Sequence, residues 1–202
     1  MRPFPFRLGL FGFICLAGLA AVNSPGIRPT TAKAAALPAA AAADLGDPPL
    51  IDITGYNDLL AHSRGRAVMV NFWATWCEPC RNEYPMVIEL SKEYAPQGLT
   101  VIGITLDDTA DVGTVRRFLA QMRPDFPNFR ERPGIDTDAF YRAVNPEWHG
   151  TMPETSFYAR DGHLARYFVG DRPRDAFVQA IRLILAVPLG EDRSNRSPVT
   201  GN

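Results

Sequence analysis

Two continuous runs of apolar residues stand out in the hydrophobic pattern of this chain. Residues 67–72 (AVMVNF) and 99–106 (LTVIGITL) have the length of β-strands and show no regular alternation of polar and apolar positions. A strand with this pattern is buried on both faces, as are strands in the middle of a parallel sheet. We therefore expect these segments to form the centre of a sheet that is flanked by helices.

Helical spacing of apolar residues follows both runs. After Cys77, the residues Val87, Leu90 and Tyr94 fall at positions i, i+3 and i+7, which places them on one face of a helix. Two later segments have the same kind of face, formed by Val112, Val115, Leu119 and Met122 and by Phe177, Ile181 and Ile184. These faces predict helices that pack against the sheet.

The remaining elements are predicted from turn residues and shorter patterns. Residues 154–159 and 163–169 are strand-like, and the Asp-Gly dipeptide between them is typical of a β-hairpin. Residues 124–133 contain three prolines and are expected to be irregular or edge-like. We also expect a short strand over 50–53, helices over 55–65 and around 138–144, and a last helix opened by Asp171 and Pro173. This order predicts an α/β fold with a central mixed sheet whose hairpin adds an antiparallel edge.

The N-terminal segment has the order of charged and apolar residues that is typical of an export signal. Arg2 and Arg7 precede an apolar run over residues 8–22, which is shorter than the ~20 residues that cross a bilayer comfortably. Residues 1–22 are therefore predicted to be a signal peptide or an uncleaved N-terminal membrane anchor, and both remain open. Both place the rest of the chain in the periplasm or on the extracytoplasmic face of the membrane, where neighbouring cysteines tend to form disulfides.

Composition divides the rest of the chain. Residues 23–49 are rich in Ala and Pro and are predicted to be a flexible linker, residues 50–188 a globular domain, and residues 189–202 a polar, disordered tail. The formal net charge is −1 over 202 residues. A charge so close to zero gives no electrostatic case for binding nucleic acid.

The cysteines suggest the chemistry. Of the three, Cys15 lies in the apolar N-terminal run, so Cys77 and Cys80 have only each other as partners. Cys77 falls where the first apolar strand ends and a helix begins, and a helix N-terminus stabilises a thiolate through its free N–H groups and partial positive charge. Cys77 is therefore the predicted nucleophile. Cys80, one turn along the same face, can resolve a mixed disulfide, and Pro79 is tolerated in the first helical turn.

Other uses of such a pair find less support. A structural zinc site needs four ligands, but no further cysteine is close in sequence and the histidines (His62, His149 and His163) are dispersed. Haem attachment needs a histidine directly after the second cysteine, where this chain has Arg81. A purely structural disulfide over so short a loop would stabilise the fold little. A redox centre is the favoured interpretation.

Two motifs resemble those of a known family. The segment VNFWATWCEPCRNEYP, residues 70–85, is similar to the active-site segment of the thioredoxin superfamily, in particular the exported TlpA-like and ResA-like thiol–disulfide oxidoreductases. TMPETSFYARDG, residues 151–162, resembles their second motif. The resemblance implies a thioredoxin-like fold behind an N-terminal extension, with disulfide exchange through Cys77 and Cys80. It implies no cofactor beyond the Cys77–Cys80 disulfide, and no metal.

The resemblance also implies which residues meet the substrate. Pro153 would be a cis-proline that leaves the Met152 backbone free to pair with an extended substrate segment. Trp76 would shield Cys77. Together with the cysteines, these residues form the predicted substrate-binding surface.

Acidic residues near the pair are expected to tune it. Thioredoxins carry a buried Asp where this chain has Asn71, which does not titrate. The ResA-like group instead resembles this chain in having an acid three residues after the second cysteine, here Glu83. Glu83 would accept or return the Cys80 proton, while Glu78 and Pro79, between the cysteines, would tune the redox potential.

Direction and partners stay open at this point. The resemblance implies a reductase for exported thiol proteins, with apocytochrome c as a candidate substrate and a membrane thiol carrier as the electron donor. A thiol oxidase of the same fold is one alternative. A copper carrier that uses Cys77, Cys80 and His149 is another. Peroxidases of the superfamily place their reactive cysteine in a Pro/Thr-rich loop without this Cys-x-x-Cys pair, so peroxidase chemistry is not favoured.

Overall fold

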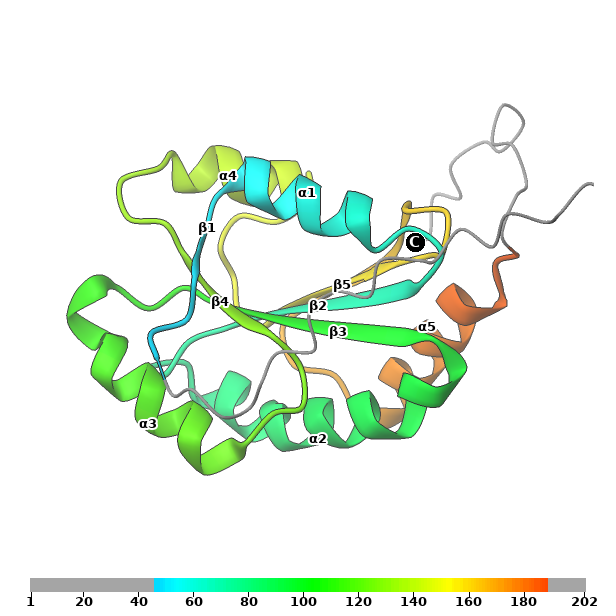
Figure 1. The fold of residues 1–202 in the computed structure, drawn as a ribbon, viewed down its shortest axis with the longest axis horizontal. Helices are drawn as coiled ribbons and strands as arrows, with labels where there is room; N and C mark the ends of the chain where they lie inside the picture. The colour runs from blue at the N-terminus through cyan, green and yellow to red at the C-terminus, as the bar shows by residue number, and fades with distance from the viewer. Residues whose placement is uncertain (1–45, 189–202) are drawn as a thin grey trace, which may run out of the picture. The chain divides into compact units, whose positions relative to one another are not determined.

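The fold is built on one mixed β-sheet. The computed structural model describes residues 46–188, whose six strands pair in the order β1-β4-β3-β2-β5-β6 (Figure 1). The strands are β1 (Leu50–Ile51), β2 (Ala67–Trp73), β3 (Leu99–Thr105), β4 (Asn128–Glu131), β5 (Glu154–Tyr158) and β6 (Leu164–Val169). The first four strands of this order are parallel, whereas β5 is antiparallel to β2 and β6 to β5. The predicted mixed sheet with an antiparallel edge is confirmed.

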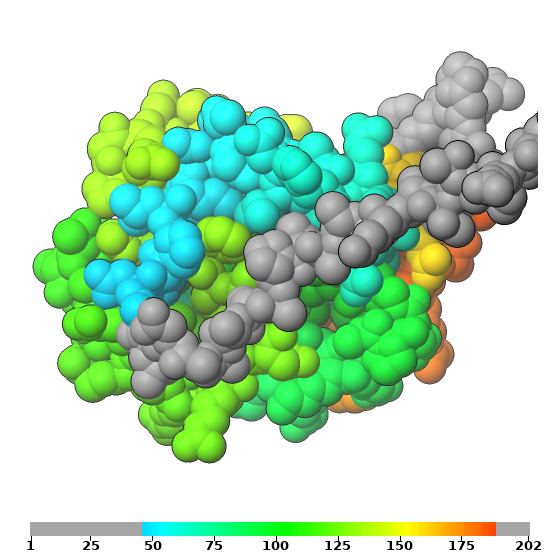
Figure 2. Space-filling view, viewed as in Figure 1, coloured from blue at the N-terminus to red at the C-terminus, as the bar shows by residue number. Residues whose placement is uncertain are grey.

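Helices cover both faces of the sheet. One face carries α1 (Ile53–His62) and α4 (Thr137–Val144), and the other carries α2 (Glu78–Tyr94), α3 (Val112–Met122) and α5 (Arg174–Ala186) (Figure 1). The space-filling view shows the segment from β1 through α1 lying against α4 (Figure 2). Tyr56 of α1 and Phe140 of α4 meet there edge to face, with ring centroids 5.9 Å apart.

The central strand β2 explains the two cores. All seven of its residues are buried, and it pairs with β3 along its whole length. Because side chains alternate across a strand, Met69 and Trp73 enter the core under α2, α3 and α5, while Val68 and Phe72 enter the core under α1 and α4. The unbroken apolar pattern therefore reflects two buried faces, as expected.

Residues 124–133 contain a strand that the sequence did not predict. β4 lies between β1 and β3, in the interior of the sheet, and Arg130 on it is buried. The expectation of an irregular or edge segment was wrong, because the prolines at 124, 127 and 133 all lie outside β4. Every residue of the strand therefore keeps its N–H donor.

The first strand is shorter than predicted. The sequence suggested a strand over residues 50–53, but β1 ends at Ile51 because Asp52 caps α1. The Asp52 side chain accepts a hydrogen bond from the Gly55 backbone N–H at 3.0 Å. Such a cap satisfies one of the free N–H groups at a helix start.

Several predicted segments lie outside the described residues. These are the signal peptide or anchor over 1–22, most of the linker over 23–49, and the tail from 189 onward. Within residues 46–188, no helix combines the length and the apolar character that a bilayer crossing requires.

Candidate active site

The two cysteines form a disulfide at the start of α2. The Cys77 and Cys80 sulfurs are bonded at 1.99 Å, and the two Cα atoms lie 5.3 Å apart. Cys77 is the residue that caps α2, and its sulfur accepts a hydrogen bond from the Cys80 backbone N–H at 3.3 Å. Cys77 is 6% exposed and Cys80 2%. The predicted position of the pair between a buried strand and a helix N-terminus is confirmed.

The residues between the cysteines suit the first turn of a helix. Pro79 needs no backbone donor there, and the negative charge of Glu78 is favourable near the positive end of the helix dipole. Both side chains are exposed. The structure thus places them beside the disulfide, and their effect on redox potential remains a prediction.

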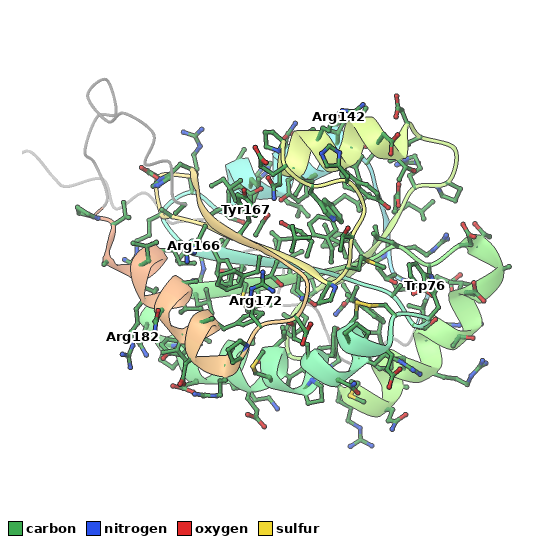
Figure 3. The ribbon with its side chains drawn as sticks, turned by 180° about the vertical axis from the view of Figure 1, so that it is seen from behind. Trp76, Arg142, Arg166, Tyr167, Arg172 and Arg182 are labelled. Carbon is green, nitrogen blue, oxygen red and sulfur yellow. A yellow bond between two sulfur atoms is a disulfide. The ribbon has the colours of Figure 1, made fainter. Side chains whose placement is uncertain are left out.

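The two tryptophans before the pair have different environments. Trp76 is 64% exposed and stands on the surface beside Cys77 (Figure 3). Trp73 is fully buried, and its ring packs against Tyr84 at 5.0 Å and Phe118 at 4.9 Å between centroids. Trp73 is therefore a core residue, while Trp76 is available for contact with a partner.

The predicted cis-proline is present in the loop before β5. The Met152–Pro153 peptide bond is cis, and Pro153 is buried. The Pro153 carbonyl accepts a hydrogen bond from the Gly170 N–H at 2.8 Å, and the Thr151 carbonyl accepts one from the Trp148 indole at 2.7 Å. These bonds hold the loop on both sides of the cis bond.

Glu83 is buried and linked to β2 and β5 through Asn71. The Asn71 side-chain amide donates to Glu83 Oε1 at 3.1 Å and to Thr155 Oγ1 at 2.9 Å. Asn71 and Thr155 are direct partners in the pairing of β2 with β5. Glu83, one turn after Cys80 on α2, is 7% exposed. The structure therefore joins the two polar residues that the sequence singled out.

Burial sets the protonation of Glu83. Desolvation raises the pKa of this carboxyl to about 7, against smaller lowering contributions from the Asn71 amide and the Arg172 backbone N–H. The nearby charges of Asp171 and Arg172 act in opposite directions, the first raising and the second lowering the pKa. A carboxyl with a pKa near 7 exchanges protons readily at neutral pH.

A family match covers most of this arrangement. The AhpC/TSA family matches residues 49–167, more than half of the chain. The chain belongs to the AhpC/TSA family. The matched region contains both cysteines, Glu83 and the cis-proline.

Curated relatives of this AhpC/TSA family member are named thiol-disulfide oxidoreductase ResA. The protein of Oceanobacillus iheyensis is 33% identical over 111 residues, which cover 55% of this chain and 53% of that protein. The protein of Bacillus thuringiensis is 27% identical over 124 residues, which cover 61% of this chain and 66% of that protein. The chain thus matches less than two thirds of the length of either relative.

A solved structure supports the fold. A Chlorobium tepidum protein described as a DsbE-type thiol:disulfide interchange protein is 30% identical, with a TM-score of 0.53 over 63% of this chain and 85% of that one. The fold of this AhpC/TSA family member is therefore thioredoxin-like, as the two sequence motifs implied.

A copper site was one of the alternatives for this cysteine pair. Within residues 46–188, no three His, Cys, Asp or Glu side chains form a group that could hold a metal ion. The copper site suggested for Cys77, Cys80 and His149 is therefore not assembled in this structure. In that loop, Trp148 is buried and hydrogen-bonded, whereas His149 beside it is exposed.

Two polar residues of this region escaped sequence analysis. Thr155 receives the second N–H of Asn71, and Glu154 directly follows the cis-proline. Glu154 is fully buried on the opposite face of the sheet, where Ser156 Oγ donates to its Oε1 at 2.7 Å. Burial raises the pKa of Glu154 to about 8, while the hydrogen bond from Ser156 and the nearby Asn145 amide lower it less. Positions 154 and 156 of the predicted strand are both polar and lie two residues apart, so the sequence could have indicated a polar pair on one face of that strand.

Proposed function

We propose that this chain is a thiol–disulfide oxidoreductase that reduces disulfides of exported proteins. One observation carries the proposal: a Cys77–Cys80 disulfide at a helix N-terminus, with a buried carboxyl one turn further along the same helix. The names of the curated relatives and of the Chlorobium structure support the reaction class.

The first chemical step belongs to Cys77. In the reduced protein, the Cys77 thiolate attacks one sulfur of a substrate disulfide and forms a mixed disulfide, while the other substrate sulfur leaves as a thiolate. The helix N-terminus favours the thiolate of Cys77, the more exposed of the two cysteines. Cys77 is therefore the nucleophile in this proposal.

The second step belongs to Cys80 and Glu83. Cys80 loses its proton and attacks Cys77, which restores the Cys77–Cys80 bond and releases the second substrate thiolate. Two electrons have then passed from the protein to the substrate. Glu83 as a carboxylate accepts the Cys80 proton, a task that suits its pKa of about 7.

The substrate docks beside the disulfide. Exposed Trp76 offers an aromatic surface, and the half-buried Met152 lies in the loop with the cis bond. An extended substrate segment can pair with the backbone of Met152, as strands pair at a sheet edge. Trp76, Met152 and Pro153 form the proposed docking surface.

Electron supply and location follow from the same proposal. A membrane thiol carrier reduces the Cys77–Cys80 disulfide after each cycle, on the periplasmic side of the membrane. Apocytochrome c, whose paired cysteines must be reduced before haem attachment, is the candidate substrate, so the proposed setting is cytochrome c maturation. A thiol oxidase of the same fold is the alternative, since the disulfide state by itself sets no direction.

Two measurements test this proposal. Reduction of insulin disulfides with dithiothreitol as electron source should be lost in Cys77→Ser and retained in Cys15→Ser, and unchanged activity of Cys77→Ser would refute the mechanism. The equilibrium of the pair with glutathione then sets the direction. A potential of about −270 mV, as in thioredoxin, supports a reductase, and one of about −120 mV supports an oxidase.

A further inference from the structure

The short segment before the disulfide is held by one buried carboxylate. Between the end of β2 and Cys77 lie three residues, Ala74, Thr75 and Trp76, which belong to no strand or helix. The Asp107 side chain accepts hydrogen bonds from the Thr75 backbone N–H at 2.9 Å and from the Thr75 hydroxyl at 2.5 Å, one on each carboxylate oxygen. Thr75 is thus gripped through its backbone and its side chain at once.

Strand pairing explains why these two residues meet. Trp73 and Thr105 are partners in the parallel pairing of β2 with β3, and the Leu106 N–H donates to the Trp73 carbonyl at 2.9 Å just beyond the strands. Continuing that register by two residues on each side brings Thr75 opposite Asp107. The contact is therefore set by the most extensive strand pair of the sheet.

Asp107 is itself fixed in place. It is 3% exposed, and Thr105 Oγ1 donates a short hydrogen bond to its Oδ2, while the Asp107 N–H donates back to Thr105 Oγ1 at 3.3 Å. Hydrogen bonds to a carboxylate are stronger than bonds between neutral groups. A buried carboxylate with three donors is a rigid anchor for the segment that it holds.

A helix-capping role does not account for Asp107. Asp107 lies just before the 3₁₀ turn over Thr109–Asp111, but the N-cap positions of that turn and of α3 are Asp108 and Asp111. The carboxylate oxygens of Asp107 instead accept hydrogen bonds from Thr75 and Thr105. Its position therefore serves the segment before the disulfide.

We propose that Asp107 is a positioning residue for the Cys77–Cys80 centre. By holding Thr75, it sets the direction of the two peptide units that lead to Cys77, and so the alignment of the Cys77 sulfur with the N-terminal N–H groups of α2. The same grip orients Trp76 on the surface. The inference rests on the proposed role of Cys77 as nucleophile, and it concerns how that thiolate is stabilised.

The test measures the Cys77 thiolate without any partner protein. The full chain carrying Cys15→Ser and Cys80→Ser has Cys77 as its sole thiol, and its rate of alkylation by iodoacetamide is followed from pH 4 to 10. In this background Thr75→Val keeps the Asp107 charge and removes one bond of the grip. We expect alkylation at pH 7 to be about three- to tenfold slower, with a higher Cys77 pKa.

Three companion variants make the outcome decisive. Thr75→Ser keeps the hydroxyl and should restore the wild-type profile, and Asp108→Asn, an exposed acid next in the chain, should leave it unchanged. Asp107→Asn should change the pH profile and the part of the tryptophan emission that is lost in a Trp76→Phe background, and it stands in if Thr75→Val does not fold. A Thr75→Val protein that melts earlier but alkylates with the wild-type pH profile would overturn the inference and assign Asp107 to stability alone. Insulin reduction is measured separately, on the protein with all its cysteines. A failure of the proposed function can therefore be distinguished from a failure of this inference.

Discussion

The side-chain amide of Asn71 on β2 donates a hydrogen bond to the carboxyl of Glu83 on α2, across 3.1 Å in the protein interior. A titratable acid is therefore buried one helical turn after Cys80, and it accepts a hydrogen bond from a neutral amide. It also means that the properties of Glu83 depend on the strand as well as on the helix.

Replacement of Glu83 by Gln should slow release of substrate from the mixed disulfide. The variant keeps the size of the side chain but cannot accept the Cys80 proton, so we expect turnover at pH 7 to fall by about a hundredfold, the lower end for general acid–base catalysis. The ionisation near pH 7 should vanish from the pH–rate profile. Glu89→Gln, an exposed acid on the same helix, is the matched control. A profile that keeps its inflection in Glu83→Gln would show that another group titrates.

A charge at position 71 should be poorly tolerated. Asn71→Asp would place two carboxyls within hydrogen-bond distance in a buried site, where like charges resist ionising together. We expect the free energy of unfolding to fall by about 2 kcal/mol or more at pH 8 and by less at pH 5.5, where the pair can hold protons. Urea unfolding of the disulfide form measures both values. Asn82→Asp, exposed on α2, should change neither.

The buried acids predict how stability depends on pH. Glu83 and Glu154 have folded pKa values of about 7 and about 8, above the ordinary value of 4.5, so the folded state holds more protons than the unfolded state in between. Their contribution to stability is therefore complete below about pH 4.5 and is lost as pH rises through 7 and 8.

Glu154, which has the higher pKa of the two acids, should contribute the larger part of this loss of stability with pH, and Glu154→Gln tests it. We expect the wild-type protein to lose on the order of 2 kcal/mol more than Glu154→Gln between pH 6 and 9, because the variant has no carboxyl to ionise in the core. Denaturation curves at each pH, recorded with the Cys77–Cys80 pair kept in one redox state, measure the free energy of unfolding. Glu147→Gln, exposed in the neighbouring loop, should follow the wild type. Parallel curves for wild type and Glu154→Gln would contradict the assignment.

Replacing Trp73 should reduce stability, whereas replacing Trp76 should reduce substrate binding. Trp73→Ala removes a fully buried ring and should cost about 3–5 kcal/mol of unfolding free energy. Trp76→Ala removes an exposed ring, so its stability should stay within about 0.5 kcal/mol of the wild type while the Michaelis constant for a protein disulfide rises. Calorimetry and insulin-reduction kinetics on the two variants, run side by side, check the contrast. A large loss of stability in Trp76→Ala would place that ring in the core.

Local patterns predicted the elements that carry the cysteines. β2 and α2 follow from an unbroken apolar run and from an i, i+3, i+7 face, and both signals lie within one segment. The cis bond before Pro153 came from the resemblance of a twelve-residue motif and not from any local rule. β4 was missed because four residues between prolines give little periodicity, and its interior place depends on distant partners.

The sequence by itself determined the strand, the helix start and the spacing that put Cys77 and Cys80 within bonding distance, because each depends on residues a few positions apart. Only the tertiary structure decided that Glu83 meets Asn71 and that Asp107 meets Thr75. Those contacts arise from which strands pair, in which register, and which face each side chain takes. Burial then decides their chemistry, since the same carboxyl has a different pKa in water than between a sheet and a helix.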